Sequence, residues 1–341
     1  MLEKPVFETE ELKKLILEEY GLSSIKSITR LSLGSAQCYE LDACNEKYFL
    51  KEFQSKYDLE DLLHEEEVAK VLASSGISTS TFISTKNKKF LWKKRGKVFQ
   101  LQKYIEGKSY SNNTAPNWLL RESSRMLAKI NNSLKEVKSL KDGFSRDFLT
   151  PDSINTSLVK LEKLRNKIRD IPSSQILRSI EDDLVFKIKK IEKFNLEINL
   201  NDLTWLNTHG DYSILQILIT NPHKINVIDL TCASRMPICW EIVRSYSYAD
   251  PLCAKGKLSI KGLKEYVTQY MKMQSLTEYD LVNMSNLYYL QILKSTFGYK
   301  EFLSQDVEDK NALLNFARWR TNVCRWLNEN NNKLCKELLS I

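Results

Sequence analysis

Two acidic residues near the middle of the chain are spaced so that they could act on one substrate. Asp211 lies in a polar turn, and Asp229 lies near the end of the second of two apolar segments, 217–219 and 225–230. Two such segments joined by a turn predict a β-hairpin, which would bring the two carboxylates together. Such a pair suits phosphoryl transfer to a hydroxyl, in which one carboxylate takes the acceptor proton and the other binds Mg²⁺.

Gln216 follows Asp211 by five residues, and its side-chain carbonyl could complete the coordination of the metal ion. A simpler interpretation is open at this point. The tripeptide His209, Gly210 and Asp211 could be a chance sequence on a surface turn, and Asp229 could merely end a strand. The elements that would position these residues must decide between the two.

A lysine inside an apolar segment is a second candidate functional residue. Lys51 follows Tyr, Phe and Leu in the predicted strand 48–53, from which it could reach nucleotide phosphates under the loop formed by Gly34, Ser35 and Ala36. The alternative is a lysine on an edge strand that faces water. Alternating apolar residues predict a five-stranded sheet from the segments 25–33, 38–41, 48–53, 90–92 and 98–104.

An amphipathic helix is predicted over 59–75, where apolar residues recur at helical spacing before Gly76. It carries two candidate partners for Lys51. Glu65 has the spacing of the buried face, and Glu67 is the second choice.

The other helices are predicted from the same periodicity. The first runs from Glu10 to Tyr20, with Thr9 as its N-cap and Gly21 at its end. The later part of the chain is mainly helical. The predicted helices there cover 118–134, 153–169, 174–193, a segment that begins at 240, 263–271, 281–296 and 312–328.

The 341 residues carry a formal net charge of +8, but basic and acidic residues alternate along most of the chain, which argues against nucleic-acid binding. Seven cysteines without a C-x-x-C pair and only three histidines argue against a zinc site and favour a reducing compartment. The sequence has neither a signal-peptide pattern nor an apolar run of membrane-spanning length. We therefore expect a cytoplasmic protein with no membrane partner.

Taken in order, the glycine loop, Lys51, the glutamate-bearing helix, the hinge-like segment 103–107, Asp211 and Asp229 resemble the aminoglycoside phosphotransferase and choline kinase superfamily of small-molecule kinases. The spore-coat kinase-like branch of Gram-positive bacteria is the most similar. The resemblance implies an α+β, protein-kinase-like two-lobed fold, with a small antiparallel sheet and one helix in the first lobe and a mainly helical second lobe. The implied domains are an N-lobe, 1–104, and a C-lobe, 105–341.

The resemblance also implies a role for each candidate residue in moving the γ-phosphate of ATP, with GTP as the alternative nucleotide, to a hydroxyl of an amino sugar, amino alcohol or related metabolite or antibiotic. Asp211 would be the catalytic aspartate, and His209 would support its loop. Asp229 and Gln216 would bind Mg²⁺. The implied nucleotide-binding residues are Lys51 at the α- and β-phosphates, Glu65 as its ion-pair partner, Gly34, Ser35 and Ala36 in the phosphate loop, and Lys103, Tyr104 and Ile105 at the adenine.

The chain departs from the family pattern at three places. Gln216 replaces the usual Asn, 213–215 replace His-Pro-Gly, and Glu241 replaces an aspartate in a helix where it and Arg244 are expected to be structural. The first two departures put the metal geometry in question, and Gln216 favours a second hypothesis, a catalytically silent nucleotide-binding or scaffold protein. A protein kinase is disfavoured because 230–237 is short for a regulated activation loop. A monomer or a homodimer is expected.

Overall fold

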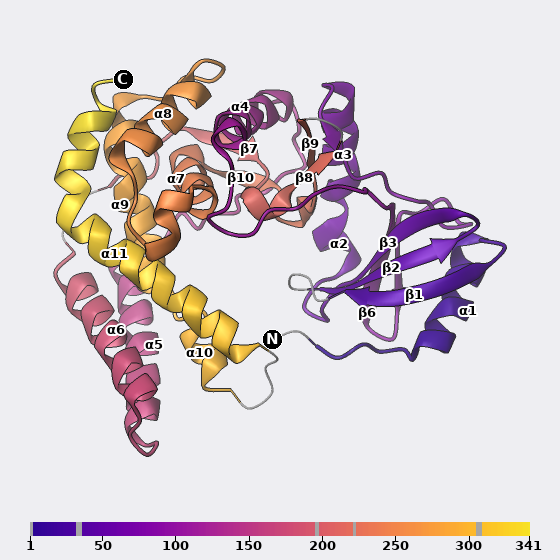
Figure 1. The fold of residues 1–341 in the computed structure, drawn as a ribbon, viewed down its shortest axis with the longest axis horizontal. Helices are drawn as coiled ribbons and strands as arrows, with labels where there is room; N and C mark the ends of the chain where they lie inside the picture. Colours follow the sequence, from indigo (N-terminus) through magenta and orange to yellow (C-terminus); the bar gives the residue numbers. More distant parts are fainter. Residues whose placement is uncertain (1–2, 32–35, 195–197, 221–222, 305–308) are drawn as a thin grey trace. The chain divides into compact units, whose positions relative to one another are not determined.

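The computed structural model describes residues 3–31, 36–194, 198–220, 223–304 and 309–341 (Figure 1). The chain forms two compact units, each built from segments that are discontinuous in sequence. The first unit contains 1–109, 136–140 and 216–233, and the second contains 110–135, 141–215 and 234–341. The predicted division at 104 stays a prediction, but the hairpin that carries Asp229 packs with the first unit.

The first unit is built on an antiparallel sheet, as predicted. Its strands follow the order β1-β2-β3-β6-β5. Their bounds are β1 Ile25–Leu31, β2 Gln37–Ala43, β3 Glu46–Glu52, β5 Leu91–Lys94 and β6 Lys97–Lys103. The register places Lys51 of β3 opposite Cys38 of β2 and Gln100 of β6, so Lys51 lies in the interior of the sheet and the edge-lysine alternative is wrong.

Side chains along each strand point alternately to the two faces of this sheet, so each face carries a different set of residues. Leu41 of β2 and Leu50 of β3 belong to a buried cluster with Leu12 and Ile16 of helix α1 (Thr9–Tyr20). Lys51, next to Leu50, therefore points to the other face. The N-cap of α1 is Glu8, without a side-chain hydrogen bond, so the prediction of Thr9 as the cap was wrong.

A second helical layer and a smaller sheet complete the first unit. The predicted helix 59–75 is present as two pieces, α2 (Leu59–Leu62) and α3 (His64–Ser74). The predicted hairpin forms from β8 (Ile217–Thr220) and β9 (Lys224–Val227), and its turn at 221–222 lies outside the described residues. Strand β9 ends before 230, and a 3₁₀ turn follows at Leu230–Cys232. A two-residue strand, β4 (Ser78–Thr79), pairs with β9 in parallel and was not predicted.

The second unit is mainly helical, as predicted. Its long helices are α4 Asn117–Ser133, α5 Pro151–Arg169, α6 Gln175–Glu192, α7 Ile238–Ala249, α8 Ile260–Met271, α9 Glu278–Lys294 and α11 Lys310–Leu338, with the short α10 at Tyr299–Phe302. Helix α11 packs along α9, and α5 packs against α6 (Figure 1). A small antiparallel pair of strands, β7 (Trp205–Thr208) and β10 (Ser234–Pro237), was not predicted.

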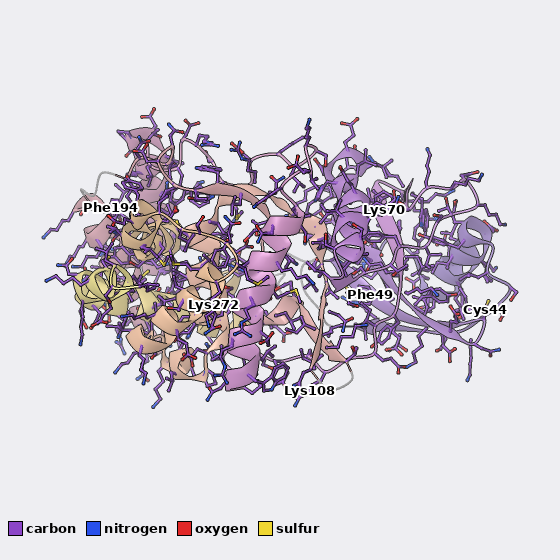
Figure 2. All side chains as sticks on the ribbon, turned by 90° about the horizontal axis from the view of Figure 1, so that it is seen from above. Cys44, Phe49, Lys70, Lys108, Phe194 and Lys272 are labelled. Carbon is purple, nitrogen blue, oxygen red and sulfur yellow. The ribbon has the colours of Figure 1, made fainter. Side chains whose placement is uncertain are left out.

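Two features of the surface relate to the predictions of partners. Nitrogen and oxygen tips of side chains are mixed over much of the visible outline, in agreement with the interleaved charges of the sequence (Figure 2). Among the described residues, the helices do not combine the length and the apolar character that crossing a membrane would require.

Candidate active site

The candidate site residues of the first unit are grouped around Lys51. Its side chain is 8% exposed, and its Nζ donates a hydrogen bond to Asp229 Oδ1 at 2.6 Å. Burial acts to lower the pKa of Lys51, but the nearby carboxylates of Asp229 and Glu65 outweigh burial and raise it. Lys51 is therefore a fixed cation in the interior of the sheet, paired with a residue 178 positions later.

The ion-pair partner of Lys51 differs from the prediction. Glu65 was expected, and it is the buried glutamate of α3, 1% exposed, whereas Glu67 is exposed and accepts a hydrogen bond from Ser139. In the structure Lys51 donates to Asp229 instead. The physical reason is desolvation, because Asp229 keeps 43% of its side chain exposed and can carry its charge at lower cost than Glu65.

Thr231 links the two acids. Its Oγ1 lies 2.9 Å from Asp229 Oδ1 and 3.3 Å from Glu65 Oε1. Burial raises the pKa of Glu65 to about 7; the charge of Lys51 opposes that rise and the charge of Asp229 adds to it. A hydroxyl has one proton to give, so a protonated Glu65 that donates to Thr231 lets Thr231 donate to Asp229.

Asp229 and Gln216 come together at the base of the β8–β9 hairpin. The backbone N–H of Ile228 donates to the carbonyl oxygen of Gln216 at 3.0 Å, which places Gln216 opposite the residue before Asp229. Asp229 has a left-handed backbone with φ of 62°, a conformation that non-glycine residues seldom adopt outside turns and functional sites.

This donor set fits Mg²⁺. A carboxylate and an amide carbonyl are hard oxygen ligands, and Mg²⁺ is usually held by one or two carboxylates together with substrate phosphates and water. The described residues contain no group of three or more His, Cys, Asp or Glu side chains that could hold a metal ion.

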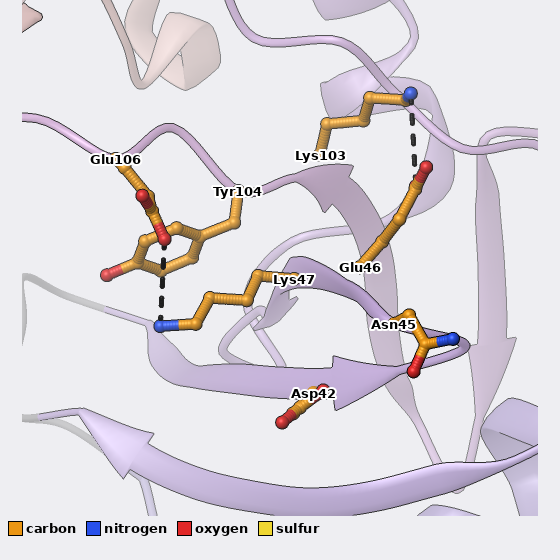
Figure 3. Close-up of a pocket in the computed structure, with 7 residues that line it drawn as sticks. All are labelled: Asp42, Asn45, Glu46, Lys47, Lys103, Tyr104 and Glu106. Carbon is orange, nitrogen blue, oxygen red and sulfur yellow. Dashed lines mark ion pairs between the residues drawn. The ribbon is translucent and has the colours of Figure 1, made fainter.

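Lys103 and Tyr104, two of the three residues predicted to bind adenine, line a pocket of about 530 Å³ in the first unit (Figure 3). The backbone N–H of Lys103 donates to Thr81 and that of Tyr104 donates to Lys47, so adenine would have to use other groups of 103–105. Lys47 lies 3.8 Å from Glu106, and Lys103 lies 3.9 Å from Glu46, as the dashed lines in Figure 3 show. The pocket is lined by Asp42, Asn45, Glu46, Lys47, Lys103, Tyr104 and Glu106.

The predicted phosphate loop is described only in part. Gly34 and Ser35 lie outside the described residues. The carbonyl oxygen of Ala36 lies 3.6 Å from the Sγ of Cys38, which shares the Lys51 face of the sheet. Phe49, labelled in Figure 2, precedes Lys51 by two residues and lies on the same face.

A separate cluster of candidate residues, in the second unit, is the turn after β7. Gly210 has φ of 80°, a value that favours glycine and lets the chain turn sharply before Asp211. His209 is fully buried, and its Nδ1 accepts a hydrogen bond from the backbone N–H of Asp211 at 3.4 Å, which agrees with the predicted supporting role. The Asp211 side chain is 38% exposed.

Two charged residues of helix α7 bind the residues of this turn. Glu241 is fully buried and accepts hydrogen bonds from the Thr208 hydroxyl and from the backbone N–H of Tyr212, the latter at 2.9 Å. Burial raises the pKa of Glu241, and the neighbouring His209 and these donors oppose the rise. Arg244 forms an ion pair with Asp211 and donates to the backbone carbonyl of Tyr212 at 3.1 Å.

The sequence matches a known family over 27–259, more than half of the chain, and the description of that family is "Phosphotransferase enzyme family". The chain belongs to this phosphotransferase family. The predicted resemblance to aminoglycoside phosphotransferases and the prediction of an enzyme that transfers phosphoryl groups are thereby confirmed. The narrower spore-coat kinase-like assignment stays a prediction. No curated protein matches the sequence.

Solved structures confirm the protein-kinase-like fold of this family. A spectinomycin phosphotransferase in complex with ADP and spectinomycin is 13% identical, with 98% of each chain covered and a TM-score of 0.63. An amicoumacin kinase in complex with AMP-PNP and Ca²⁺ is 14% identical, with 94% of each chain covered and a TM-score of 0.62. A microcompartment-associated aminopropanol kinase is 11% identical, covers 95% of this chain and 99% of its own, and has a TM-score of 0.63.

Two residues of this phosphotransferase were not singled out for the site by sequence reasoning. Thr231 follows Asp229 by two residues, but a threonine in a turn carries no signal of its own. Arg244 was expected to be structural, and it contacts Asp211. Its position three residues after Glu241 indicates only that the two residues share one face of a helix, and the sequence carries no signal for the contact with Asp211.

Replacing Glu65 by glutamine is expected to remove a pH dependence of stability. The pKa of Glu65 is about 7 in the folded chain against 4.5 for an ordinary glutamate, so the folded state holds this proton more tightly. The resulting stabilisation is complete below pH 4.5 and is lost as the pH rises through about 7, at a cost on the order of 2–3 kcal/mol. Denaturant unfolding between about pH 5 and about pH 8 measures it in both proteins.

The matched control for this measurement is Glu66→Gln on the same helix, because Glu66 is partly exposed and pairs with Lys70. We expect the free energy of unfolding of Glu66→Gln to change with pH as that of the wild type does. Parallel curves for wild type and Glu65→Gln would show that the buried carboxyl keeps its ordinary titration.

Proposed function

We propose that this phosphotransferase is a kinase that moves the γ-phosphoryl group of ATP, bound with Mg²⁺, to a hydroxyl of a small molecule. The observation that carries the proposal is the 2.6 Å pair between Lys51 and Asp229, in the interior of the sheet and backed by the buried Glu65. A buried cation beside an exposed carboxylate, held by different segments, is the arrangement that nucleotide phosphates and their metal ion need.

Lys51 would bind the phosphates of the nucleotide. When phosphates are present, its Nζ can exchange one anionic partner, Asp229, for another without leaving its charge unpaired. Once Nζ leaves Asp229, the ionised form of Glu65, on the neighbouring α3, can compensate the charge of the lysine. We infer that Glu65 orients Lys51 in the nucleotide-bound state, although Asp229 holds it in the present structure.

Asp229 and Gln216 would hold Mg²⁺ through a carboxylate oxygen and an amide oxygen. Bound Mg²⁺ would supply positive charge against the phosphates during transfer. Gln216 is one methylene longer than the asparagine usual in the family, and the hydrogen bond from Ile228 fixes its backbone beside Asp229.

Asp211 would orient the acceptor hydroxyl and take its proton as the new bond to phosphorus forms. Hydrogen bonds with His209, Glu241 and Arg244 hold the backbone of its turn. The partly exposed Asp211 carboxylate is therefore attached to a well-fixed segment of backbone. General bases of this kind typically contribute about 10²- to 10⁴-fold to rate.

For the acceptor, we propose a compound that carries a hydroxyl near an amine. The named relatives are kinases or phosphotransferases of spectinomycin, amicoumacin and aminopropanol. Their low identity supports the fold, and the choice among acceptors therefore has to come from assay. A cytoplasmic location and a monomeric or homodimeric state also stay predictions.

A catalytically silent nucleotide-binding or scaffold protein is the second candidate. Gln216 in place of asparagine and the altered residues 213–215 favour it. The two candidates differ in one respect that can be measured, because both bind ATP with Mg²⁺ but only a kinase forms a phosphorylated product.

The experiment is a coupled assay of ADP release against a panel of amino alcohols, aminocyclitols and amino sugars, with ATP and GTP compared, followed by mass spectrometry of the acceptor. Phosphorylated product that depends on the wild-type protein and is lost in Asp211→Asn supports the kinase. Tight binding of ATP with Mg²⁺ without product across the panel would favour the silent protein.

Replacing Gln216 by alanine is expected to lower kcat by about 10- to 100-fold while changing ATP affinity less, because a contact that orients charge matters most in the transition state. Steady-state titrations in ATP and in acceptor measure both effects. Gln274→Ala, a partly exposed glutamine of the second unit, is the control and should match the wild type. Identical kcat and KM for Gln216→Ala would remove Gln216 from the active site.

A further inference from the structure

One face of helix α7 carries two opposite charges toward a single turn. Glu241 and Arg244 are three residues apart and therefore lie on the same side of the helix. The Glu241 carboxylate accepts the backbone N–H of Tyr212, and the Arg244 guanidinium donates to the backbone carbonyl of the same residue. Both backbone groups of Tyr212 are thus bound by one helix, which fixes the chain directly after Asp211.

Arg244 also reaches the side chain of Asp211. One of its terminal nitrogens donates to Asp211 Oδ1, while the other donates to the Tyr212 carbonyl. A planar guanidinium with several donors can make both contacts at a fixed mutual angle, which the single ammonium group of lysine cannot do. The rotation of the Asp211 carboxylate is therefore coupled to the backbone that follows it.

The guanidinium is itself held in place. Its side chain is 13% exposed, and its central carbon lies 4.6 Å from the ring centroid of Tyr248 and 5.8 Å from that of Trp240. Tyr248 is buried and packs edge-on against Trp319. A guanidinium enclosed by aromatic rings has few alternative positions, and it would lose its charge compensation if it left Asp211.

We propose that Arg244 is a positioning residue, which holds one carboxylate oxygen of Asp211 so that the second oxygen meets the acceptor hydroxyl. This inference rests on the proposed function, in which Asp211 is the base. The contact with Arg244 restricts the rotamers open to the carboxylate, and a displacement of about 1 Å at a reacting group can cost about 100-fold in rate. The ion pair leaves the nucleotide-binding residues of the first unit untouched.

The test compares Arg244→Met and Arg244→Lys with a matched control, Arg325→Met. Arg325 is an arginine of the same unit that pairs with Asp183 at 2.9 Å and lies 4.3 Å from the ring of Phe186, so it reproduces the chemistry of the pair away from the turn. We expect kcat to fall about 10- to 100-fold in Arg244→Met with the KM for ATP nearly unchanged. Arg244→Lys should recover activity only partly, and added guanidinium ion should raise the turnover of Arg244→Met but not that of Arg325→Met.

A second readout does not depend on turnover. Amide hydrogen exchange over 208–213, measured without acceptor, should be faster in Arg244→Met than in wild type and unchanged there in Arg325→Met. A wild type that phosphorylates no acceptor overturns the proposed function, whereas the exchange data still decide whether Arg244 holds the turn. Equal kcat in Arg244→Met and wild type, a higher kcat in Arg244→Met, or equal exchange over 208–213 overturns the inference.

Discussion

Asp211→Asn is expected to reduce kcat by about 10³-fold, in the middle of the range for loss of a general base. Asparagine keeps an oxygen that can accept the hydrogen bond from Arg244, so the turn should remain in place. It loses the ability to take a proton from the acceptor. Because Asp211 and Lys51 belong to different units, we expect the affinity for ATP with Mg²⁺ to change by less than about threefold.

The control for this variant is Asp183→Asn, since Asp183 is also paired with an arginine of the second unit. It should retain wild-type turnover at temperatures below its unfolding transition. Burst and steady-state measurements of product with the best acceptor of the panel give the comparison. An Asp211→Asn protein that keeps turnover within about tenfold of the wild type would show that this carboxylate is not the base.

The fold was largely predictable because its elements are long and periodic. Helices such as α4 and α9 repeat apolar residues at helical spacing over 17 residues each, and a pattern of that length is hard to confuse with a strand. Strand β2 alternates because one face packs against α1 and the other lies on the side of Lys51. Gly21 ends α1 in the left-handed conformation, as its residue type predicted.

The short elements were not predictable for the opposite reason. Strand β4 has two residues, and β7 and β10 have four each, so these segments are too short for an alternating apolar pattern to be recognised. They form because a partner distant in sequence offers backbone hydrogen bonds, as when β7 pairs with β10. The break between α2 and α3 at Leu63 was likewise not predictable from the sequence, because the apolar residues keep helical spacing on both sides of it.

The candidate site also has features that the sequence predicts and features that it does not. Lys51 could be found because a charged residue inside an apolar strand is costly unless it has a partner. Its partner could not be identified from the sequence, because Asp229 and Glu65 both fit and the choice depends on how much of each is exposed. The contact of Arg244 with Asp211 spans 33 residues and depends on how α7 docks under the turn.

Lys51→Met is expected to weaken the binding of ATP with Mg²⁺ by about 30- to 100-fold, because a charge-assisted hydrogen bond contributes about 2–3 kcal/mol and each 1.4 kcal/mol is about tenfold in affinity. Methionine keeps much of the length and volume of the lysine stem, so the packing of β3 between β2 and β6 should survive. What is lost is a cation next to Asp229 and Glu65, and the phosphates would then meet these acidic side chains without it.

Calorimetric titration with ATP and Mg²⁺ measures this loss, and circular dichroism checks the fold. Lys97→Met is a closely matched control, because Lys97 lies on β6 of the same sheet, is 6% exposed like Lys51, and pairs with a carboxylate, that of Glu3. It should bind nucleotide as the wild type does. If Lys51→Met has a native spectrum and an unchanged affinity, the lysine is outside the nucleotide site. If both variants lose affinity equally, the effect arises from the stability of the sheet, and the contact between Lys51 and the phosphates is not its cause.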